Sequence, residues 1–155
     1  MDLELLDVTS EAKYPYRYSM GTVPSFFFRM IRDERRIFGR KCMKCGTVYL
    51  PPRPVCGPCF TPTTEWVEVG PRGTLAGFTV VYFTFLDPMT GKRREVPYGY
   101  GMVKLDGTDR RFQHFLSEND PKKLQVGMRM EPVFAEERKG NLGDILCFRP
   151  VAEGT

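Results

Sequence analysis

Four of the five cysteines fall in two close pairs, and their spacing is the clearest chemical signal in the sequence. Cys42-Met43-Lys44-Cys45 and Cys56-Gly57-Pro58-Cys59 are two C-x-x-C motifs separated by ten residues. The two-residue spacer lets both sulfurs of a motif face one ion, and two motifs complete a tetrahedral four-sulfur site. Four cysteine ligands leave no open position for a substrate. The sequence therefore predicts one structural zinc ion, with the ligands Cys42, Cys45, Cys56 and Cys59.

Other cysteine chemistries use similar patterns. A rubredoxin-like iron site has the same four ligands, so the sequence leaves zinc and iron both open and electron transfer remains an alternative function. A thioredoxin-like redox pair is disfavoured because neither motif lies between a strand and a helix of a βαβ unit. The N-terminus, Met1–Asp7, carries acids where a secretory signal carries Lys or Arg. This predicts a cytoplasmic protein, and a reducing compartment disfavours disulfides.

The other candidate nucleophile and base are single residues. Cys147 is the one unpaired cysteine, and we interpret it as a buried, inert thiol. His114 is the only histidine and stands in the alternation Phe112, His114, Leu116, which favours a packed or surface strand residue over a general base. The sequence has no G-x-S-x-G, phosphate-loop or dinucleotide-binding glycine motif. It predicts a binding or scaffolding subunit without catalytic residues of its own.

Basic residues are concentrated around the first cysteine motif. The chain has a net charge of +4, whereas the segment from Arg29 to Arg53 alone carries eight basic residues and two acids. Four thiolates and one divalent metal would lower the balance of this segment from +6 to about +4. Such a segment suits a few phosphates, and a solvated helix face is the alternative interpretation.

A helix is predicted before the cysteine motifs. It begins at Thr22, with Thr22 or Ser25 as its cap. Its apolar residues recur at helical spacing and a glycine ends it, namely Phe27, Ile31, Phe38 and Gly39. The following residues, 40–63, contain five of the thirteen prolines, which excludes regular helix. This segment needs a metal in place of an apolar core.

The sequence after Gly73 is typical of β-structure. It is rich in Thr, Val, Phe and Tyr, and turn residues occur at Asp87–Gly91 and Asp106-Gly107. Five strands are predicted, over residues 74–86, 98–105, 111–116, 129–135 and 144–151. Five such strands match a small barrel of the OB type, with a five-stranded sandwich as the alternative.

The predicted fold class is thus mainly β, with an N-terminal arm and helix (1–39), a rubredoxin-like zinc ribbon (40–69) and a five-stranded OB-fold domain (70–155). Hydrophobic residues make up 41% of the chain and charged residues 27%, which is ordinary for a globular protein. No run approaches the roughly 18 consecutive apolar residues that a membrane span requires. We therefore expect no membrane partner.

The order of these motifs resembles one known family. The first segment that carries the resemblance runs from Arg36 to Gly46, and the second, Tyr49–Cys59, includes Pro-Pro-Arg-Pro before the second cysteine pair. Trp66-Val67-Glu68 and Gly73-Thr74-Leu75 then open the barrel. From Pro24 to Val151 the chain resembles the DUF35 family of OB-fold, rubredoxin-like zinc-ribbon proteins. It departs from the family at Phe60, where many relatives have Gly.

This resemblance implies a small noncatalytic partner of acyl-CoA enzymes. Members of the family accompany thiolase-superfamily subunits, for example in archaeal acetoacetyl-CoA thiolase complexes and in two-subunit thiolases such as benzoylsuccinyl-CoA thiolase. The implied function is to scaffold a thiolase-like catalytic subunit, in a hetero-oligomer, and to help bind coenzyme A. The partner would perform the thiolytic cleavage or Claisen condensation.

Coenzyme A carries phosphates and an adenine, which call for basic side chains and a flat apolar surface. The candidate residues are Arg36, Arg40, Lys41, Lys44 and Arg53 for the phosphates and Phe60 or Trp66 for the adenine. Core packing is the alternative role for the two aromatic residues. The alternative function is a nucleic-acid-binding module, because ribbons and OB barrels both bind single strands. The near-neutral barrel makes nucleic acid the less favoured partner.

Overall fold

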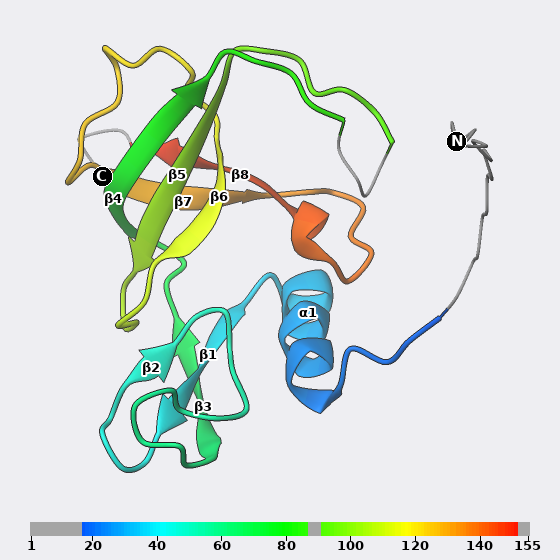
Figure 1. The fold of residues 1–155 in the computed structure, drawn as a ribbon, viewed down its shortest axis with the longest axis vertical. Helices are drawn as coiled ribbons and strands as arrows, with labels where there is room; N and C mark the ends of the chain where they lie inside the picture. Colours follow the sequence, from blue (N-terminus) through cyan, green and yellow to red (C-terminus); the bar gives the residue numbers. More distant parts are fainter. Residues whose placement is uncertain (1–16, 87–90, 152–155) are drawn as a thin grey trace, which may run out of the picture.

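A small antiparallel sheet and a closed barrel lie end to end, with one helix beside the sheet (Figure 1). The computed structural model describes residues 17–86 and 91–151; residues 1–16, which are part of the predicted N-terminal arm, and the turn residues 87–90 lie outside this part. Helix α1 spans Thr22–Glu34. The small sheet has the order β2-β1-β3, formed by β1 (Ile37–Cys42), β2 (Val48–Tyr49) and β3 (Thr63–Val69). Within the described residues, no helix is long and apolar enough to cross a membrane.

The barrel closes in the order β4-β5-β6-β8-β7. Its strands are β4 (Gly73–Val81), β5 (Tyr98–Leu105), β6 (Phe112–Leu116), β7 (Arg129–Phe134) and β8 (Ile145–Pro150). β6 and β8 pair in parallel and the other neighbours are antiparallel. Pairing of β4 with β7 closes the barrel, which confirms the predicted OB-type barrel over the sandwich.

The first predicted barrel strand is too long. β4 ends at Val81, which pairs with Tyr98 at the start of β5. Residues 82–86 have the same apolar composition. Among the described residues, however, no barrel strand pairs with them, and only Leu86 forms an isolated bridge, to Arg93. The side chains of this segment are exposed. The composition of this segment does not reveal that β5, the strand that pairs with β4, begins only at Tyr98.

The predicted cap and end of the helix are also wrong. Gly21 precedes the helix and no side chain caps it; the Ser25 hydroxyl donates to the Gly21 carbonyl instead. The helix ends at Glu34 because Arg35 adopts a left-handed conformation, with φ of 56°. Phe38 lies in β1, opposite Glu68. Gly39 is a strand residue, and a Cβ there would lie 2.9 Å from the Tyr49 carbonyl oxygen.

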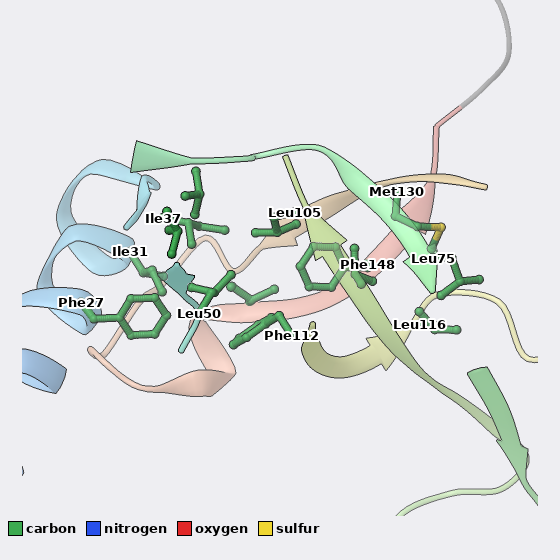
Figure 2. Close-up of a cluster of buried hydrophobic side chains, with 14 of the residues drawn as sticks. Phe27, Ile31, Ile37, Leu50, Leu75, Leu105, Phe112, Leu116, Met130 and Phe148 are labelled. Atoms are coloured by element: carbon green, nitrogen blue, oxygen red, sulfur yellow. The ribbon is translucent and has the colours of Figure 1, made fainter. Parts of the chain in front are cut away.

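One hydrophobic core joins the helix, the small sheet and the barrel. Phe27 and Ile31 of α1 belong to the same buried cluster as Leu50, which follows β2, and Leu105 and Phe148 of the barrel. Figure 2 shows the α1 side chains at one end of this cluster and the barrel side chains at the other. Each fully buried side chain of this kind stabilises the fold by about 1.5–3 kcal/mol. The end of the small sheet that faces the barrel is therefore held there by the burial of apolar side chains.

The connection between β7 and β8 ties α1 to the barrel. Asp144 is buried, and its carboxylate accepts the backbone N–H groups of Lys139 and Gly140 at 2.7 Å and of Asn141 at 3.3 Å. In the same connection Arg138 donates from Nε to the carbonyl oxygen of Arg32, in the last turn of α1, at 2.6 Å. The carboxylate of Asp144 thus shapes the connection that holds the helix end.

We expect Asp144→Ala to lower the free energy of unfolding by about 2 kcal/mol, because three backbone donors lose a charged acceptor. Urea denaturation of the metal-loaded chain measures this change. Glu137→Ala, in the same connection but exposed, is the matched control and should change stability by less than about 0.5 kcal/mol. Equal stabilities of the two variants would contradict the role given to Asp144.

Candidate metal centre and the adjoining cavity

The two C-x-x-C motifs fold into turns of the same shape. In the first, the Cys42 N–H donates to the Thr47 carbonyl at 2.9 Å and the Gly46 N–H donates to the Cys42 carbonyl at 2.8 Å. The same two bonds recur in the second motif, both at 2.9 Å, with Cys56, Phe60 and Thr61 in the corresponding places. The first turn joins β1 to β2 and the second precedes β3. Each turn presents its two sulfurs toward the other.

The residue after each motif has a left-handed backbone. Gly46 has φ of 77° and Phe60 has φ of 53°. This conformation costs a residue with a Cβ roughly 1–2 kcal/mol more than it costs glycine. Phe60 nevertheless keeps the hydrogen bond that Gly46 makes in the first turn, so its departure from the family pattern leaves the turn intact. Its side chain is 85% exposed.

The four cysteine sulfurs lie within 4.8 Å of one another. Sγ of Cys45 and Sγ of Cys56 are 3.7 Å apart. Tetrahedral zinc with Zn–S bonds of about 2.3 Å places neighbouring sulfurs about 3.8 Å apart, so this edge fits a four-sulfur zinc site. Cys42 and Cys56 are buried, Cys59 is half-buried and Cys45 is exposed.

Hydroxyl groups surround the sulfurs. Oγ1 of Thr61 lies 3.5 Å from Sγ of Cys42, and Oγ1 of Thr47 lies 3.2 Å from Sγ of Cys45. The hydroxyl oxygen of Tyr49 lies 3.3 Å from Sγ of Cys56. A hydroxyl donates a hydrogen bond to a thiolate, and such outer contacts orient metal ligands. The surroundings therefore favour the ionised sulfurs that a metal needs.

The pKa values of the thiols show the need for a cation. The pKa of Cys42 is lowered to about 6, first by the Thr61 hydroxyl and then by the backbone N–H of Cys45. Thr47 lowers the pKa of Cys45, whereas the nearby sulfur of Cys45 and burial raise the pKa of Cys59 to about 12. Four crowded sulfurs do not all ionise by themselves. A divalent ion would offset their mutual repulsion and hold both turns together.

Three of the residues predicted to bind coenzyme A gather beside α1. Arg36 donates to both carboxylate oxygens of Glu68, at 2.9 and 2.5 Å, and is also paired with Glu34. The guanidinium of Arg40 lies 4.9 Å from the ring centroid of Trp66. Trp66 in turn packs on Phe26 of α1, with 4.2 Å between ring centroids. Packing against the helix therefore accounts for Trp66, and ion pairing accounts for Arg36.

The structure places the other four candidates elsewhere. Lys41 faces Glu65, with 3.7 Å between Nζ and Oε2. Lys44 is exposed in the first turn, and Phe60 is exposed after the second. Arg53 is the only one of the seven candidates that lines the cavity described next. The candidates therefore do not converge on a single surface.

A cavity of about 340 Å³ lies between the second cysteine turn and the connection from β5 to β6. Its lining residues are Tyr49, Leu50, Pro51, Arg53, Gly57, Pro58, Arg110 and Arg111. Sequence reasoning missed Arg110 and Arg111, which lie about sixty residues from the ribbon side of the cavity. The basic residues singled out from the sequence lie close together along the chain, around the cysteine motifs, and these two arginines lie outside that segment. Contacts between distant segments bring them to this cavity.

Two known domain families match this chain. The "ChsH2, rubredoxin-like zinc ribbon domain" matches residues 31–65, and the "ChsH2, C-terminal OB-fold domain" matches residues 66–135. The two matches are contiguous and cover both the four-cysteine centre and most of the barrel. The chain belongs to the DUF35 family.

Two archaeal proteins are similar to this DUF35 chain in sequence. Each is described as a "DUF35 domain-containing scaffold protein". The one from Methanocaldococcus jannaschii is 27% identical over 122 residues, which is 78% of this chain and 83% of the relative. The one from Methanothermobacter thermautotrophicus is 25% identical over 123 residues, which is 78% of this chain and 88% of the relative.

Two solved structures share the fold. The "Ltp2-ChsH2(DUF35) aldolase" superposes with a TM-score of 0.62 at 24% identity and covers 86% of this chain and 98% of that chain. A DUF35 protein of unknown function from Sulfolobus solfataricus superposes with a TM-score of 0.58 at 19% identity, covering 84% of each chain. These likenesses show that the chain shares its fold with both structures. The zinc ribbon domain that matches residues 31–65 and the cluster of four cysteines support a structural zinc ion in this DUF35 ribbon.

The two single chemistry-bearing residues of this DUF35 chain lie in the barrel. His114 of β6 is buried and donates from Nε2 to the Leu142 carbonyl at 3.2 Å. Burial, with a smaller contribution from Arg94, lowers the pKa of His114, so the ring is neutral at pH 7. Cys147 of β8 is half-buried, and burial raises the pKa of its thiol. These shifts keep the Cys147 sulfur a thiol and the His114 ring uncharged.

We expect the double variant Cys42→Ser, Cys56→Ser to lose zinc and the order of the two cysteine turns, residues 42–47 and 56–61. The buried cluster at this end of the ribbon consists only of Cys42, Cys56 and Tyr49, with Cys59 packed against it, so no apolar core replaces the metal. Zinc analysis and amide NMR spectra measure the two losses, while signals of the barrel strands should remain dispersed. Cys147→Ser is the matched control and should retain one zinc. Dispersed signals from residues 42–47 and 56–61 in the double variant would contradict this account.

Proposed function

We propose that this DUF35 chain is a noncatalytic scaffold subunit of a thiolase-superfamily acyl-CoA complex and helps to bind coenzyme A. The partner subunit carries the residues for thiolytic cleavage or Claisen condensation. The observation that carries the proposal is the similarity, over most of both chains, to two proteins described as scaffolds. The fold is also that of the DUF35 chain in a structure described as an Ltp2-ChsH2 aldolase, in which a DUF35 protein accompanies a second component.

An exposed apolar segment supports a protein partner. Tyr82, Phe83, Phe85 and Leu86 follow the end of β4, and between 46% and 69% of each side chain is exposed. Exposed apolar residues that cluster in this way mark interaction surfaces, and aromatic residues are enriched at the centres of protein interfaces. We infer that these four residues contact the catalytic subunit.

The single histidine and the cysteines of the chain support a noncatalytic role. The neutral His114 ring already uses Nε2 for a carbonyl oxygen, and its burial removes it from a substrate in solution. The raised pKa of Cys147 makes it a poor nucleophile at neutral pH. The four remaining cysteines fill a closed metal site. Acid–base and nucleophilic steps therefore fall to the partner.

Arg53 and Phe60 are the candidates best placed to contact coenzyme A. Among the described residues, no carboxylate forms an ion pair with Arg53, whereas Arg36 and Lys41 are each paired with a glutamate. Phe60 presents its ring to solvent beside the second turn. An unpaired guanidinium binds phosphate and an exposed ring stacks on adenine.

We expect affinity purification of the tagged chain from its native host, at moderate salt, to recover a thiolase-like subunit in a fixed ratio, identified by mass spectrometry. The variant Phe83→Ser, Phe85→Ser should keep its zinc and lose most of this subunit, because the proposed contact surface loses its aromatic side chains. Leu146→Ser, an exposed barrel substitution, is the matched control and should recover the subunit normally.

Two results would contradict the proposal. One is recovery of nucleic-acid-associated proteins together with nuclease-sensitive material, which would assign the chain to the alternative nucleic-acid-binding class. The other is that the catalytic subunit, once separated from this chain, keeps its thiolase activity and gains none when the chain is added back. In that case the chain would be neither a scaffold for the enzyme nor part of its coenzyme A site.

A further inference from the structure

We propose that the cavity between the second cysteine turn and the β5–β6 connection binds the phosphate groups of a nucleotide-type ligand. The choice of a coenzyme A-type ligand rests on the proposed function, whereas the phosphate site itself rests on the geometry of the cavity. The juxtaposition that carries the inference is three arginines from two distant segments around one recess, Arg53 from the ribbon and Arg110 and Arg111 from the barrel connection.

The charge of the cavity is unbalanced. No carboxylate lines it, and within the described part of the chain none of the three arginines belongs to an ion pair, although other arginines such as Arg36 and Arg129 do. The neighbouring Asp109 does not line the cavity, and among the described residues it forms no ion pair with the three arginines; its Oδ2 accepts the Val48 N–H at 2.8 Å. Three guanidinium groups of like charge at one recess favour an anion with several charges, and phosphate oxygens accept their paired N–H donors.

The barrel side of the cavity is held in place without a ligand. The Asp109 carboxylate accepts the Val48 N–H, and the Asp109 N–H donates to the Val48 carbonyl at 3.1 Å. This pair of bonds fastens the β5–β6 connection to β2. The guanidinium of Arg110 then stacks on the Tyr49 ring, 4.9 Å from its centroid, with Nη2 3.5 Å from the hydroxyl oxygen. Arg110 is therefore positioned before a phosphate arrives, which lowers the entropy cost of binding.

The ribbon side is also fixed. Tyr49 is buried, and its hydroxyl accepts the Gly57 N–H at 3.2 Å. The backbone of the Arg53 segment is held by Thr63, whose hydroxyl donates to the Arg53 carbonyl and whose N–H donates to the Pro54 carbonyl at 3.0 Å. Arg53 itself is exposed and lines the cavity. Both walls are thus built by backbone contacts that do not involve the three guanidinium groups.

The shape of the cavity indicates a phosphate ester rather than free phosphate. A volume of about 340 Å³ lies within the range of small-molecule sites and exceeds what one phosphate fills. Leu50, Pro51 and Pro58 add apolar wall to the three cations. A diphosphate or phosphomonoester attached to a ribose matches this combination of charge and apolar surface. A ligand in this position touches the ribbon and the barrel together.

Titration of the zinc-loaded full chain, followed by amide NMR and calorimetry, tests the inference. The probes are coenzyme A, inorganic pyrophosphate and pantetheine, which lacks phosphate. We expect coenzyme A and pyrophosphate to shift the signals of Arg53, Arg110 and Arg111, and pantetheine to leave them unchanged. Arg111→Gln should weaken binding of both phosphate probes by about tenfold, because one charged donor is lost. The affinity should also fall with rising salt.

Arg149→Gln is the matched control, since Arg149 is a barrel arginine that is paired with Glu131, 2.8 Å away, and does not line the cavity. It removes the same charge and should change affinity less than twofold. Arg111→Gln is the decisive variant because Arg110 also packs on Tyr49 beside the metal centre. Equal affinities in Arg111→Gln and Arg149→Gln, or no shift with pyrophosphate, would overturn the phosphate site.

The outcomes separate this inference from the proposed function. In one outcome the chain recovers the catalytic partner, but its cavity variants bind the phosphate probes as well as the unmodified chain does. That result would overturn the cavity assignment and leave the proposed function standing. Pyrophosphate binding that depends on Arg111, in a chain that recovers no acyl-CoA enzyme, would support the phosphate site and overturn the proposed function. Tighter binding of a single-stranded oligonucleotide than of coenzyme A, lost in Arg111→Gln, would overturn the ligand class.

Discussion

Four cysteine sulfurs within 4.8 Å of one another hold together a segment that has almost no apolar interior of its own. The side chains buried at this end of the ribbon are two of those cysteines and Tyr49. Without a cation the sulfurs oppose one another, as the raised pKa of Cys59 shows. A divalent ion reverses this repulsion, so the same four residues that destabilise the metal-free turns stabilise the loaded ones. The conformations of both turns therefore depend on the bound cation, which replaces repulsion among the sulfurs by attraction to the metal.

The effect of the metal centre extends to the surface through Tyr49. Its hydroxyl touches Sγ of Cys56, accepts the Gly57 N–H and lies within reach of Arg110. The other end of the ribbon is fixed differently, since Ile37 and Leu50 enter the core shared with α1 and the barrel. Burial thus positions the ribbon on the barrel, while the metal shapes its far end. The arginine-lined cavity lies where these two constraints meet, so its geometry needs both.

The features that the sequence predicts well are those that depend on local spacing. Cysteine pairs with two-residue spacers and strands bounded by turn residues can be recognised from the local sequence, and four of the five barrel strands lie close to their expected ranges. The end of α1 does not follow from spacing, because Phe38 continues the helical pattern while its pairing with Glu68 places it in a strand. Gly39 ends no helix; it allows β1 to approach Tyr49 closely.

The candidate site shows the same limit. The four cysteines were found from their spacing, whereas the five basic candidates for coenzyme A contacts were chosen from charge along the chain, which says nothing of their ion-pair partners. Glu68 is 32 residues from Arg36, and Arg110 is 61 residues from Tyr49. The first contact arises when β3 pairs with β1, and the second arises when the β5–β6 connection packs against the ribbon. The residues of a site that is built from such long-range contacts can be identified only once the fold is known.

The central claim is that one metal ion with four sulfur ligands determines the structure of the ribbon. X-ray absorption at the metal edge, on the protein as purified, measures both the element and its nearest neighbours. The account predicts zinc with four sulfur atoms at about 2.3 Å and no lighter ligand. Iron in the site, or a shell in which oxygen or nitrogen replaces one of the sulfurs, would contradict it.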